Sequence, residues 1–120
     1  MNKFFKTLFS VFLILLLETS VSYSEQSKIK IGVLVPLSGD NASLGKQILN
    51  SIRMALIDID NNKIEVYPKD TGSDPELTLN SALELEQMGI SLVIGPVFHK
   101  NLLYLDKVKN VTFLSLTNKT

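Results

Sequence analysis

Residues 28–35 read Lys-Ile-Lys-Ile-Gly-Val-Leu-Val, and this stretch decides the fold that the sequence predicts. It begins with alternating charged and apolar residues and ends as a continuous apolar run. That pattern is typical of a strand that is buried on both faces of a parallel sheet. Pro36-Leu-Ser-Gly39 follows directly and ends the strand, because proline and glycine interrupt regular structure.

Segments with helical and strand periodicity alternate along the rest of the chain. Apolar residues from Asn41 onward recur at the spacing of an amphipathic helix. Ile64-Glu-Val-Tyr67 alternates in and out, as expected for a strand at a sheet edge, and Pro68 follows it. Asp74 and Pro75 suit the cap and the first turn of another helix. We therefore expect strands at 28–35, 64–67, 90–94 and 111–116, and helices at 41–59, 75–88 and 101–107.

The predicted order of elements is βαβαβαβ. Strands that are joined through helices of this length need crossover connections, so the sheet is parallel and has helices on both faces. We therefore predict an α/β fold with a doubly wound parallel sheet. If the alternating strand is the edge, the strand order is 2-1-3-4, and a ligand crevice lies between the first and third strands, beside the loops that begin at Pro36 and Gly95. Since no helix follows to cover the last strand, we expect an incomplete first lobe.

The first 24 residues have the features of a secretory signal peptide. Lys3 and Lys6 precede an apolar run over residues 8–17, and Ser22-Tyr-Ser24 has the small-x-small pattern that a signal peptidase cleaves. As a helix, the run is about 15 Å long, which is roughly half of a bilayer core. We therefore expect residues 1–24 to be removed and residues 25–120 to be periplasmic.

The composition excludes several classes of protein. Twelve Lys and Arg balance twelve Asp and Glu, so the chain offers no basic field for a phosphate backbone, and we expect no nucleic-acid partner. The absence of Cys excludes disulfides, a thiol nucleophile and Cys-ligated metals. His99 is the one histidine, which excludes a multi-His site. We expect no metal and no cofactor.

Two motifs suggest enzyme chemistry, but neither fits it. Residues 39–47 lie between a strand and a helix, as a nucleotide-binding loop does, yet five residues separate the two glycines and Gln47 stands where a Ser or Thr is needed. Asp70-Thr-Gly72 is the tripeptide of aspartic proteases, but their chemistry needs two carboxylates that share a proton. A turn at the rim of the sheet explains this tripeptide better. We therefore expect no catalytic residue and no enzyme.

Five blocks of sequence follow one another at a characteristic spacing. The blocks are 29–39, Leu44-Gly45, Asp70 with Asp74-Pro75, 92–95 and 113–118. In this order they resemble the first lobe of the type 1 periplasmic binding proteins, specifically the leucine/isoleucine/valine-binding family. The resemblance covers nearly all of residues 25–120 and identifies them as the N-terminal part of a leucine-binding-protein-like domain.

The resemblance implies a two-lobed protein that closes on an amino acid, with loop amides and hydroxyls of the first lobe holding the ligand's carboxylate and ammonium. The family's ligand positions fall on Leu44, His99 and Thr117. The family commonly has an aromatic residue at the first position and Ser at the second, whereas Thr117 matches. His99 could equally be a solvated side chain, and the helix start near Asn41 a simple cap. The ligand-binding residues that we expect are Ser38, Gly39, Leu44, Phe98, His99 and Thr117.

The implied function is that of an extracytoplasmic solute-binding protein, which delivers an amino acid or a similar small polar ligand to the membrane permease of an ABC transporter. The alternative is a penicillin-binding-protein activator, a relative on the same fold that regulates peptidoglycan synthesis and whose partner is a cell-wall synthase. Gly95-Pro-Val-Phe98 and Asp70-Thr-Gly72 resemble this branch at least as closely. The outer-membrane activators are lipoproteins, however, and no Cys is present here to carry a lipid.

Overall fold

The computed structural model describes residues 2–17, 27–59 and 62–117 of the chain. The strands are β1 (Ile29–Val35), β2 (Ile64–Asp70), β3 (Leu92–Ile94) and β4 (Thr112–Leu114). The helical elements are α1 (Asn2–Leu17), α2 (Ala42–Ile59), α3 (Pro75–Gln87) and the short 3₁₀ helices η1 (His99–Leu102) and η2 (Leu105–Lys107).

The four strands form one parallel sheet in the order β2-β1-β3-β4, which confirms the predicted topology. β1 pairs with β2 along its whole length, from Ile29 opposite Ile64 to Val35 opposite Asp70. On its other side β1 pairs with β3. The continuous apolar strand is therefore internal, and the alternating strand β2 is the edge, as their sequence patterns predict.

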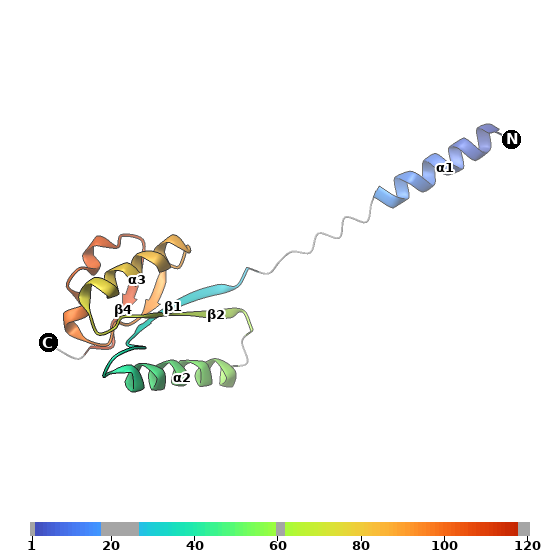
Figure 1. Ribbon diagram of the computed structural model, residues 1–120. Helices are drawn as coiled ribbons and strands as arrows, with labels where there is room; N and C mark the ends of the chain where they lie inside the picture. The colour runs from blue at the N-terminus through green and yellow to red at the C-terminus, as the bar shows by residue number, and fades with distance from the viewer. Residues whose placement is uncertain (1, 18–26, 60–61, 118–120) are drawn as a thin grey trace.

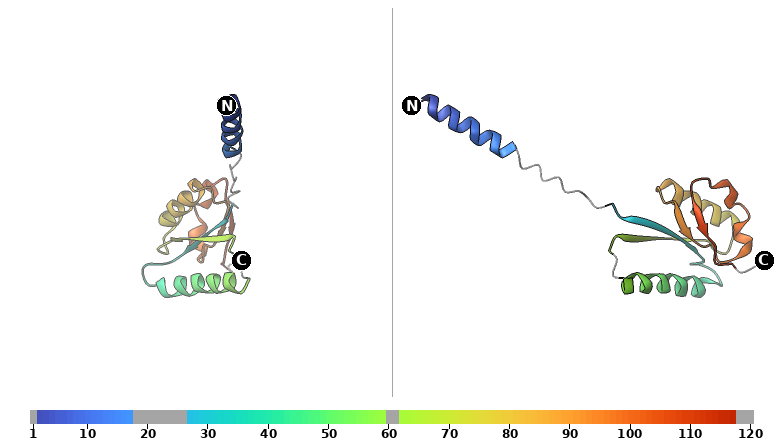
Figure 2. Two further views of the ribbon diagram at one scale, coloured as in Figure 1. Left: turned by 90° about the vertical axis from the view of Figure 1, so that its right-hand side faces the viewer. Right: turned by 180° about the vertical axis from the view of Figure 1, so that it is seen from behind.

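Helices cover both faces of the sheet, as Figure 1 and the two views in Figure 2 show. Side chains of β1 alternate between two cores. Val33 and Val35 are fully buried on the face that carries α2, where they pack with Leu49. Leu34 is fully buried on the opposite face, where it packs with α3 residues such as Leu85. The apolar run of β1 thus fills both layers at once, which is what the sequence predicts for a doubly wound fold.

Strand β2 is longer than predicted, because it continues through Pro68 to Asp70. Pro68 lies opposite Val33 in the register. A proline lacks a backbone N–H, and an edge strand can hold one because half of its N–H groups have no neighbouring strand to donate to. The prediction that the strand ends at Tyr67 was therefore wrong. Because of this extension, Asp70 lies opposite Val35, the last residue of β1.

The segment between β3 and β4 also differs from the prediction. We expected one short helix at 101–107, but the chain forms η1 and η2 instead. Their hydrogen bonds join residues three apart, for example from the Asn101 amide to the Phe98 carbonyl at 3.0 Å and from the Lys107 amide to the Tyr104 carbonyl at 3.1 Å. β3 and β4 are correspondingly shorter than the apolar runs at 90–94 and 111–116.

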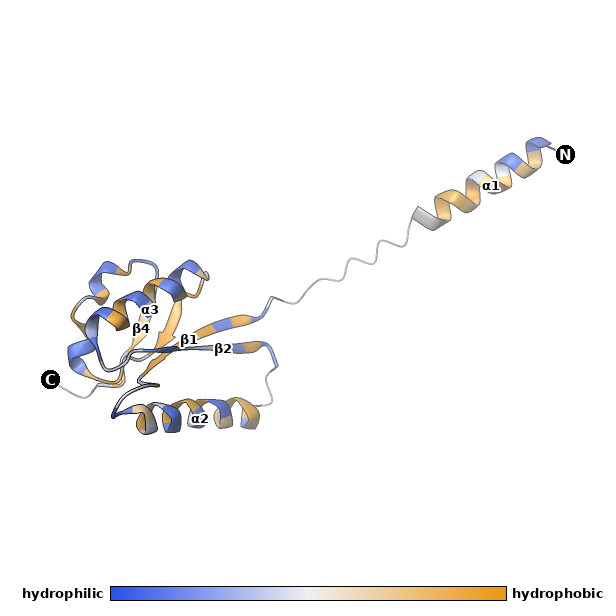
Figure 3. Ribbon diagram, in the orientation of Figure 1, coloured by the Kyte–Doolittle hydropathy of each residue, from blue (hydrophilic) through white to orange (hydrophobic). Residues whose placement is uncertain are grey.

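Helix α1 holds the apolar N-terminal run that Figure 3 shows in orange. Its large side chains are exposed, with 70% of Phe5 and 64% of Phe12 accessible to solvent. None of the helices in the described residues is both long enough and apolar enough to cross a membrane. The predicted cleavage site at residues 22–24 lies outside the described residues, so the signal peptide stays a prediction.

Candidate functional site

The predicted crevice lies at the carboxyl ends of β1 and β3. These two strands are neighbours, and the chain leaves them in different directions. It runs from β1 to α2 on one face of the sheet, and from β3 to η1 and η2 on the face that carries α3. In open α/β sheets this arrangement leaves a crevice in which ligands bind. The segments that follow these two strands are residues 36–41 after β1 and 95–98 after β3, and residues 71–74 follow the neighbouring edge strand β2.

The first of these segments is fixed to the edge strand by the carboxylate of Asp70, the last residue of β2. The Leu37 amide donates a hydrogen bond to Oδ1 of Asp70 at 2.7 Å, and the Gly72 amide donates to the same oxygen at 2.8 Å. The Ser38 hydroxyl lies 2.5 Å from Oδ2. One carboxylate thus joins the loop after β1 to the turn after β2, and we call this arrangement the Asp70 clip.

The pKa of Asp70 follows from these contacts. Partial burial acts to raise the pKa, but hydrogen bonds from the Ser38 hydroxyl and from the backbone amides of Leu37, Gly72 and Ser38 outweigh it and lower the pKa below the ordinary value. The carboxylate is therefore ionised at neutral pH. An ionised carboxylate has no proton to donate, so it accepts all of the hydrogen bonds that it makes.

The loop then turns into α2 through a close contact. Gly39 has a φ of +74°, and its carbonyl accepts a hydrogen bond from the Ala42 amide at 3.2 Å. A Cβ on Gly45 would lie 1.7 Å from the backbone oxygen of Pro36, so only glycine fits at this point of the helix. Asn41 donates a hydrogen bond to the Ser73 hydroxyl at 3.0 Å, which ties the start of α2 to the turn after β2.

Ser38 and Gly39 are both exposed at this edge of the sheet, and so is Leu44 in the first turn of α2. The structure therefore places these predicted ligand residues on one connected segment. Leu44 brings only an apolar surface, of which 40% is accessible. Direct ligand contact by the three residues remains a prediction.

The segment after β3 is held by β4. The Gly95 amide donates to the Leu114 carbonyl at 2.8 Å, and the Leu116 amide donates to the Pro96 carbonyl at 3.0 Å. A Cβ on Gly95 would lie 2.2 Å from the backbone oxygen of Leu34, so the end of β3 lies tightly against β1. Phe98 is half-buried and precedes η1.

His99 is exposed at the start of η1 and lines a hollow of ≈ 310 Å³. Its neighbours in that hollow are Pro75, Lys100, Leu102 and Leu103. His99 thus lies beside the start of α3, whereas Ser38 lies against Asp70. Thr117 is half-buried, and its amide lies 3.3 Å from the Ser115 hydroxyl. Asn118, which follows it, lies outside the described residues.

Two polar residues of this region were not identified from the sequence. Asp70 was placed in a turn and in one of the blocks that carry the resemblance, but its hydrogen bonds were not predicted, because its partners Leu37 and Ser38 are more than 30 residues away in sequence. Asn101 in η1 is 99% buried, and neither its amide nitrogen nor its side-chain oxygen has a hydrogen-bond partner among the described residues. No local pattern in the sequence distinguishes either residue from an ordinary surface side chain.

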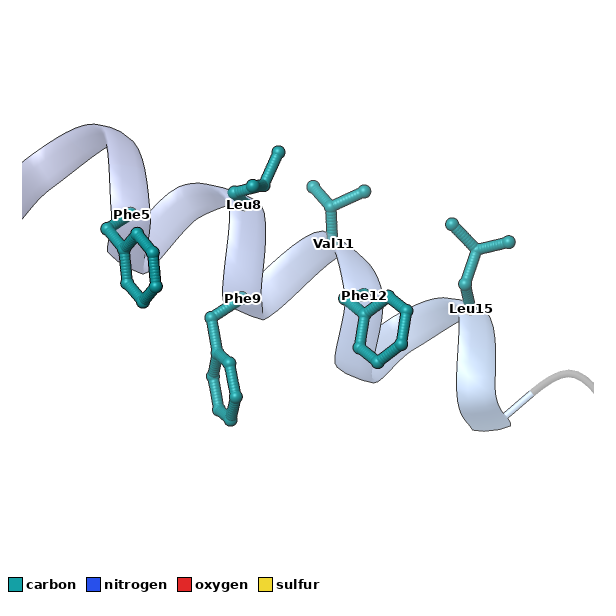
Figure 4. Close-up of a pocket in the computed structure, with 6 residues that line it drawn as sticks. All are labelled: Phe5, Leu8, Phe9, Val11, Phe12 and Leu15. Atoms are coloured by element: carbon teal, nitrogen blue, oxygen red, sulfur yellow. The ribbon is translucent and has the colours of Figure 1, made fainter.

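A second hollow lies on α1, and Figure 4 shows the six side chains that line it. They are Phe5, Leu8, Phe9, Val11, Phe12 and Leu15. All six come from one helix and none carries a polar atom, so this hollow has no group that could orient a polar ligand. Within residues 2–17, 27–59 and 62–117, no three His, Asp or Glu side chains are grouped in a way that could hold a metal ion.

The sequence matches the periplasmic binding protein family over residues 28–117. Among solved structures, the chain is similar to the C-terminal domain of LpoA from Haemophilus influenzae, a regulator of PBP1A (28% identity, 75% of this chain and 28% of that chain, TM-score 0.63). It is also similar to a solute-binding protein of an ABC transporter from Rhodopseudomonas palustris in complex with 3,4-dihydroxybenzoic acid (30% identity, 70% and 24% covered, TM-score 0.63).

The leucine-binding protein LivK of Thermotoga maritima shares the fold at 21% identity, with 72% of this chain and 27% of that chain covered and a TM-score of 0.65. The chain spans about a quarter of the length of these proteins and of the curated relatives that it matches. The match extends from before β1 to the end of the described residues, and the strand order is the predicted one. The chain therefore belongs to the periplasmic binding protein family, and its sheet is a portion of the type 1 fold.

Proposed function

We propose that the chain contributes the first-lobe half of a ligand site in an extracytoplasmic solute-binding protein, which delivers an amino acid or a similar small polar ligand to the membrane permease of an ABC transporter. The single observation that carries this proposal is the Asp70 clip. It holds the loop after β1, in which Ser38 and Gly39 are exposed, at the point of the sheet where the connections diverge.

Rigidity of this loop supports ligand capture. Loop amides and hydroxyls bind tightly only when they are held in position before the ligand arrives, since ordering them on binding costs free energy. Here Asp70 binds the Leu37 amide, Pro36 lies against Gly45 of α2, and Asn41 at the far end of the loop donates to the Ser73 hydroxyl. The N-terminus of α2 adds a partial positive charge near the loop. Closure of a second lobe over the ligand completes the mechanism.

The experiment is a thermal-shift panel of the 20 amino acids and of substituted benzoates, followed by calorimetry on any compound that stabilises the chain. We expect at least one compound to stabilise it by an amount that rises with the logarithm of ligand concentration once the concentration exceeds the dissociation constant. The double variant His99→Ala with Thr117→Ala should bind that compound more weakly. Unchanged affinity in the double variant would show that these two residues are wrongly assigned.

A second candidate function is regulation of a cell-wall synthase. The observation that favours it is the similarity to LpoA, at 28% identity and a TM-score of 0.63 for the C-terminal domain. This candidate predicts co-purification of the chain with a penicillin-binding synthase and no stabilisation by any compound of the panel. The solute-binding candidate predicts stabilisation by at least one compound of the panel and no co-purification with a penicillin-binding synthase.

Both candidates require export, for which we propose residues 1–24 as a signal peptide. The exposed apolar side chains of α1 support this proposal, because a helix of this kind has no core to fill in the α/β part. The intact mass of the protein from an extracytoplasmic fraction tests it. A first residue at Glu25 is expected, and a retained Met1 would contradict it.

A further inference from the structure

One side of α2 borders a hollow that the proposed function does not use. The hollow measures ≈ 400 Å³ and lies between the helix, the end of β3 and the chain after β4. It is lined by Ile48, Ser51, Ile52, Ala55, Ile94 and Leu116, none of which is charged. In the described part of the chain α2 lies alone along this face of the sheet, as Figure 1 shows. The hollow can therefore receive side chains from an element that packs beside α2.

The uncharged side of α2 extends beyond the hollow in both directions. With 3.6 residues per turn, Leu44 and Ile59 lie on the same side as the residues that line the hollow, and they are 40% and 64% exposed. Lys46, Asn50 and Arg53 lie on the opposite side. A helix side of this kind is typical of a surface that packs against another helix. We call its residues the α2 stripe: Leu44, Ile48, Ser51, Ile52, Ala55 and Ile59.

The α2 stripe is symmetric about the midpoint between Ser51 and Ile52. If a second α2 lies antiparallel with its midpoint at the same place, Ile48 of each copy faces Ala55 of the other. Ile52 of each copy likewise faces Ser51 of the other, so large side chains meet small ones. A parallel arrangement would instead place Ile48 against Ile48. A two-fold axis needs this self-complementarity, because every contact across it occurs twice.

Ser51 can be covered without loss of a hydrogen bond. Its hydroxyl donates to the Gln47 carbonyl of the same helix at 3.0 Å. The single proton of the hydroxyl is thus already used, and an apolar side chain can lie against Ser51 without leaving a buried donor unpaired. Small side chains at positions 51 and 55 also allow two helices to approach closely, toward the lower end of the usual 8–10 Å between axes.

The area of the contact depends on the flank formed by β3 and β4. A stable interface buries about 800 Å² on each partner. α2 has 18 residues and is about 27 Å long, so one side of it supplies only part of this area. Leu114 and Leu116 are 51% and 45% exposed, and Leu116 borders the hollow. A second α2 in the hollow would cover these two side chains as well, and by symmetry the first helix would cover those of the other copy.

We propose that the α2 stripe is an interface between two copies of this chain, in which the two α2 helices pack antiparallel about a two-fold axis between Ser51 and Ile52. Each helix fills the hollow of the other copy beside Ile94 and Leu116. Leu44 then faces Ile59 of the other copy, so this side chain without polar atoms belongs to the contact between copies and not to the ligand. The proposal goes beyond the proposed function and does not depend on it.

Disulfide cross-linking tests the arrangement, because the sequence has no Cys and each variant therefore has a single thiol. Ser51→Cys, Ala55→Cys and Asn50→Cys are made in the full chain and oxidised under identical conditions. In the antiparallel pair the two residues 51 are about 1.5 Å apart along the helix axes, whereas the two residues 55 are about 10 Å apart. A disulfide needs Cα atoms within about 7 Å of each other. Asn50→Cys is the control on the opposite side of the helix.

We expect Ser51→Cys to form a disulfide-linked dimer with a yield about tenfold higher than Ala55→Cys or Asn50→Cys. Equal yields from positions 51 and 55 would indicate parallel packing, and equal yields from all three would indicate association through α1 or random collision. Either result would overturn the proposal. A monomer in which the thiol at position 51 resists a maleimide reagent would also overturn it, because another segment would then cover the α2 stripe.

Sedimentation equilibrium gives a second test that needs no cysteine. The wild type is compared with Ala55→Asp, which places a carboxylate in the contact, and with Asn50→Asp, which adds the same charge on the opposite side of the same helix. We expect the dimer dissociation constant to rise at least about tenfold in Ala55→Asp and to stay unchanged in Asn50→Asp. A monomeric wild type, or equal dissociation constants in the two variants, would overturn the proposal and leave the proposed function standing.

Discussion

The substitution Gly45→Ala tests the close contact that joins the loop after β1 to α2. Gly45 lies in the first half of α2 and is buried. In an ordinary helix, replacing glycine by alanine stabilises by about 1 kcal/mol, because alanine loses less backbone entropy. Here the new Cβ would lie 1.7 Å from the Pro36 oxygen and 2.6 Å from the Pro36 carbonyl carbon.

The magnitude follows from the size of this clash. Real Cβ atoms do not approach other heavy atoms within 3.0 Å, so the loop and the helix must separate by about 1.3 Å. Overpacking lowers the free energy of unfolding by up to about 3 kcal/mol. We expect a value near this upper limit, because the clash is with backbone and no side-chain rotation can relieve it. Because alanine also gains about 1 kcal/mol in helix propensity, the free energy of unfolding should fall by about 2 kcal/mol in total. The melting temperature should fall by roughly 8–16 °C.

Urea denaturation followed by circular dichroism at 222 nm measures the effect. The control is Asn50→Ala on an exposed position of the same helix, which should stabilise slightly, by up to about 0.7 kcal/mol. Equal or greater stability of Gly45→Ala relative to the wild type would refute the reasoning, since it would mean that Pro36 does not contact α2 as described.

Three further outcomes follow from the same structure. The lowered pKa of Asp70 contributes stability that is present above about pH 4 and is lost as the pH falls through the folded-state pKa, so acid unfolding of Asp70→Asn should depend less on pH than that of the wild type. Leu85→Ala should lose about 2–5 kcal/mol in chemical denaturation because Leu85 is fully buried, whereas Leu103→Ala, at a position 65% exposed, should stay within about 0.5 kcal/mol. Asp74→Ala removes the cap of α3 and should cost about 0.5–2 kcal/mol, a result that a thermal melt with an unchanged midpoint would contradict.

The topology could be predicted from the sequence because burial leaves a direct trace in the pattern of apolar residues. The second half of β1 is apolar on both sides and the strand lies inside the sheet, whereas β2 alternates and lies at its edge. The cap of α3 could also be predicted from the sequence, because Asp74 caps the helix and Pro75 begins it within one turn of the chain. Local signals of this kind need no knowledge of distant residues.

The parts that could not be predicted depend on contacts between distant residues. Pro68 was interpreted as a strand end, because its place at an open edge is a property of the whole sheet. The hydrogen bond from the Leu37 amide to Asp70 joins residues 33 positions apart, and no local pattern around either residue predicts it. One helix was expected at 101–107, but the chain forms two 3₁₀ helices there.

Chemical-shift mapping of the ¹⁵N-labelled chain with L-leucine tests the central claim, which is that a ligand binds at the carboxyl ends of β1 and β3. NMR detects binding even in the millimolar range. The account predicts shifts that grow with ligand concentration and are confined to the amides of residues 37–41, 95–99 and 117. Shifts centred on the hollow that His99 lines beside Pro75 and Leu103, with residues 37–41 and 95–98 unchanged, would contradict it.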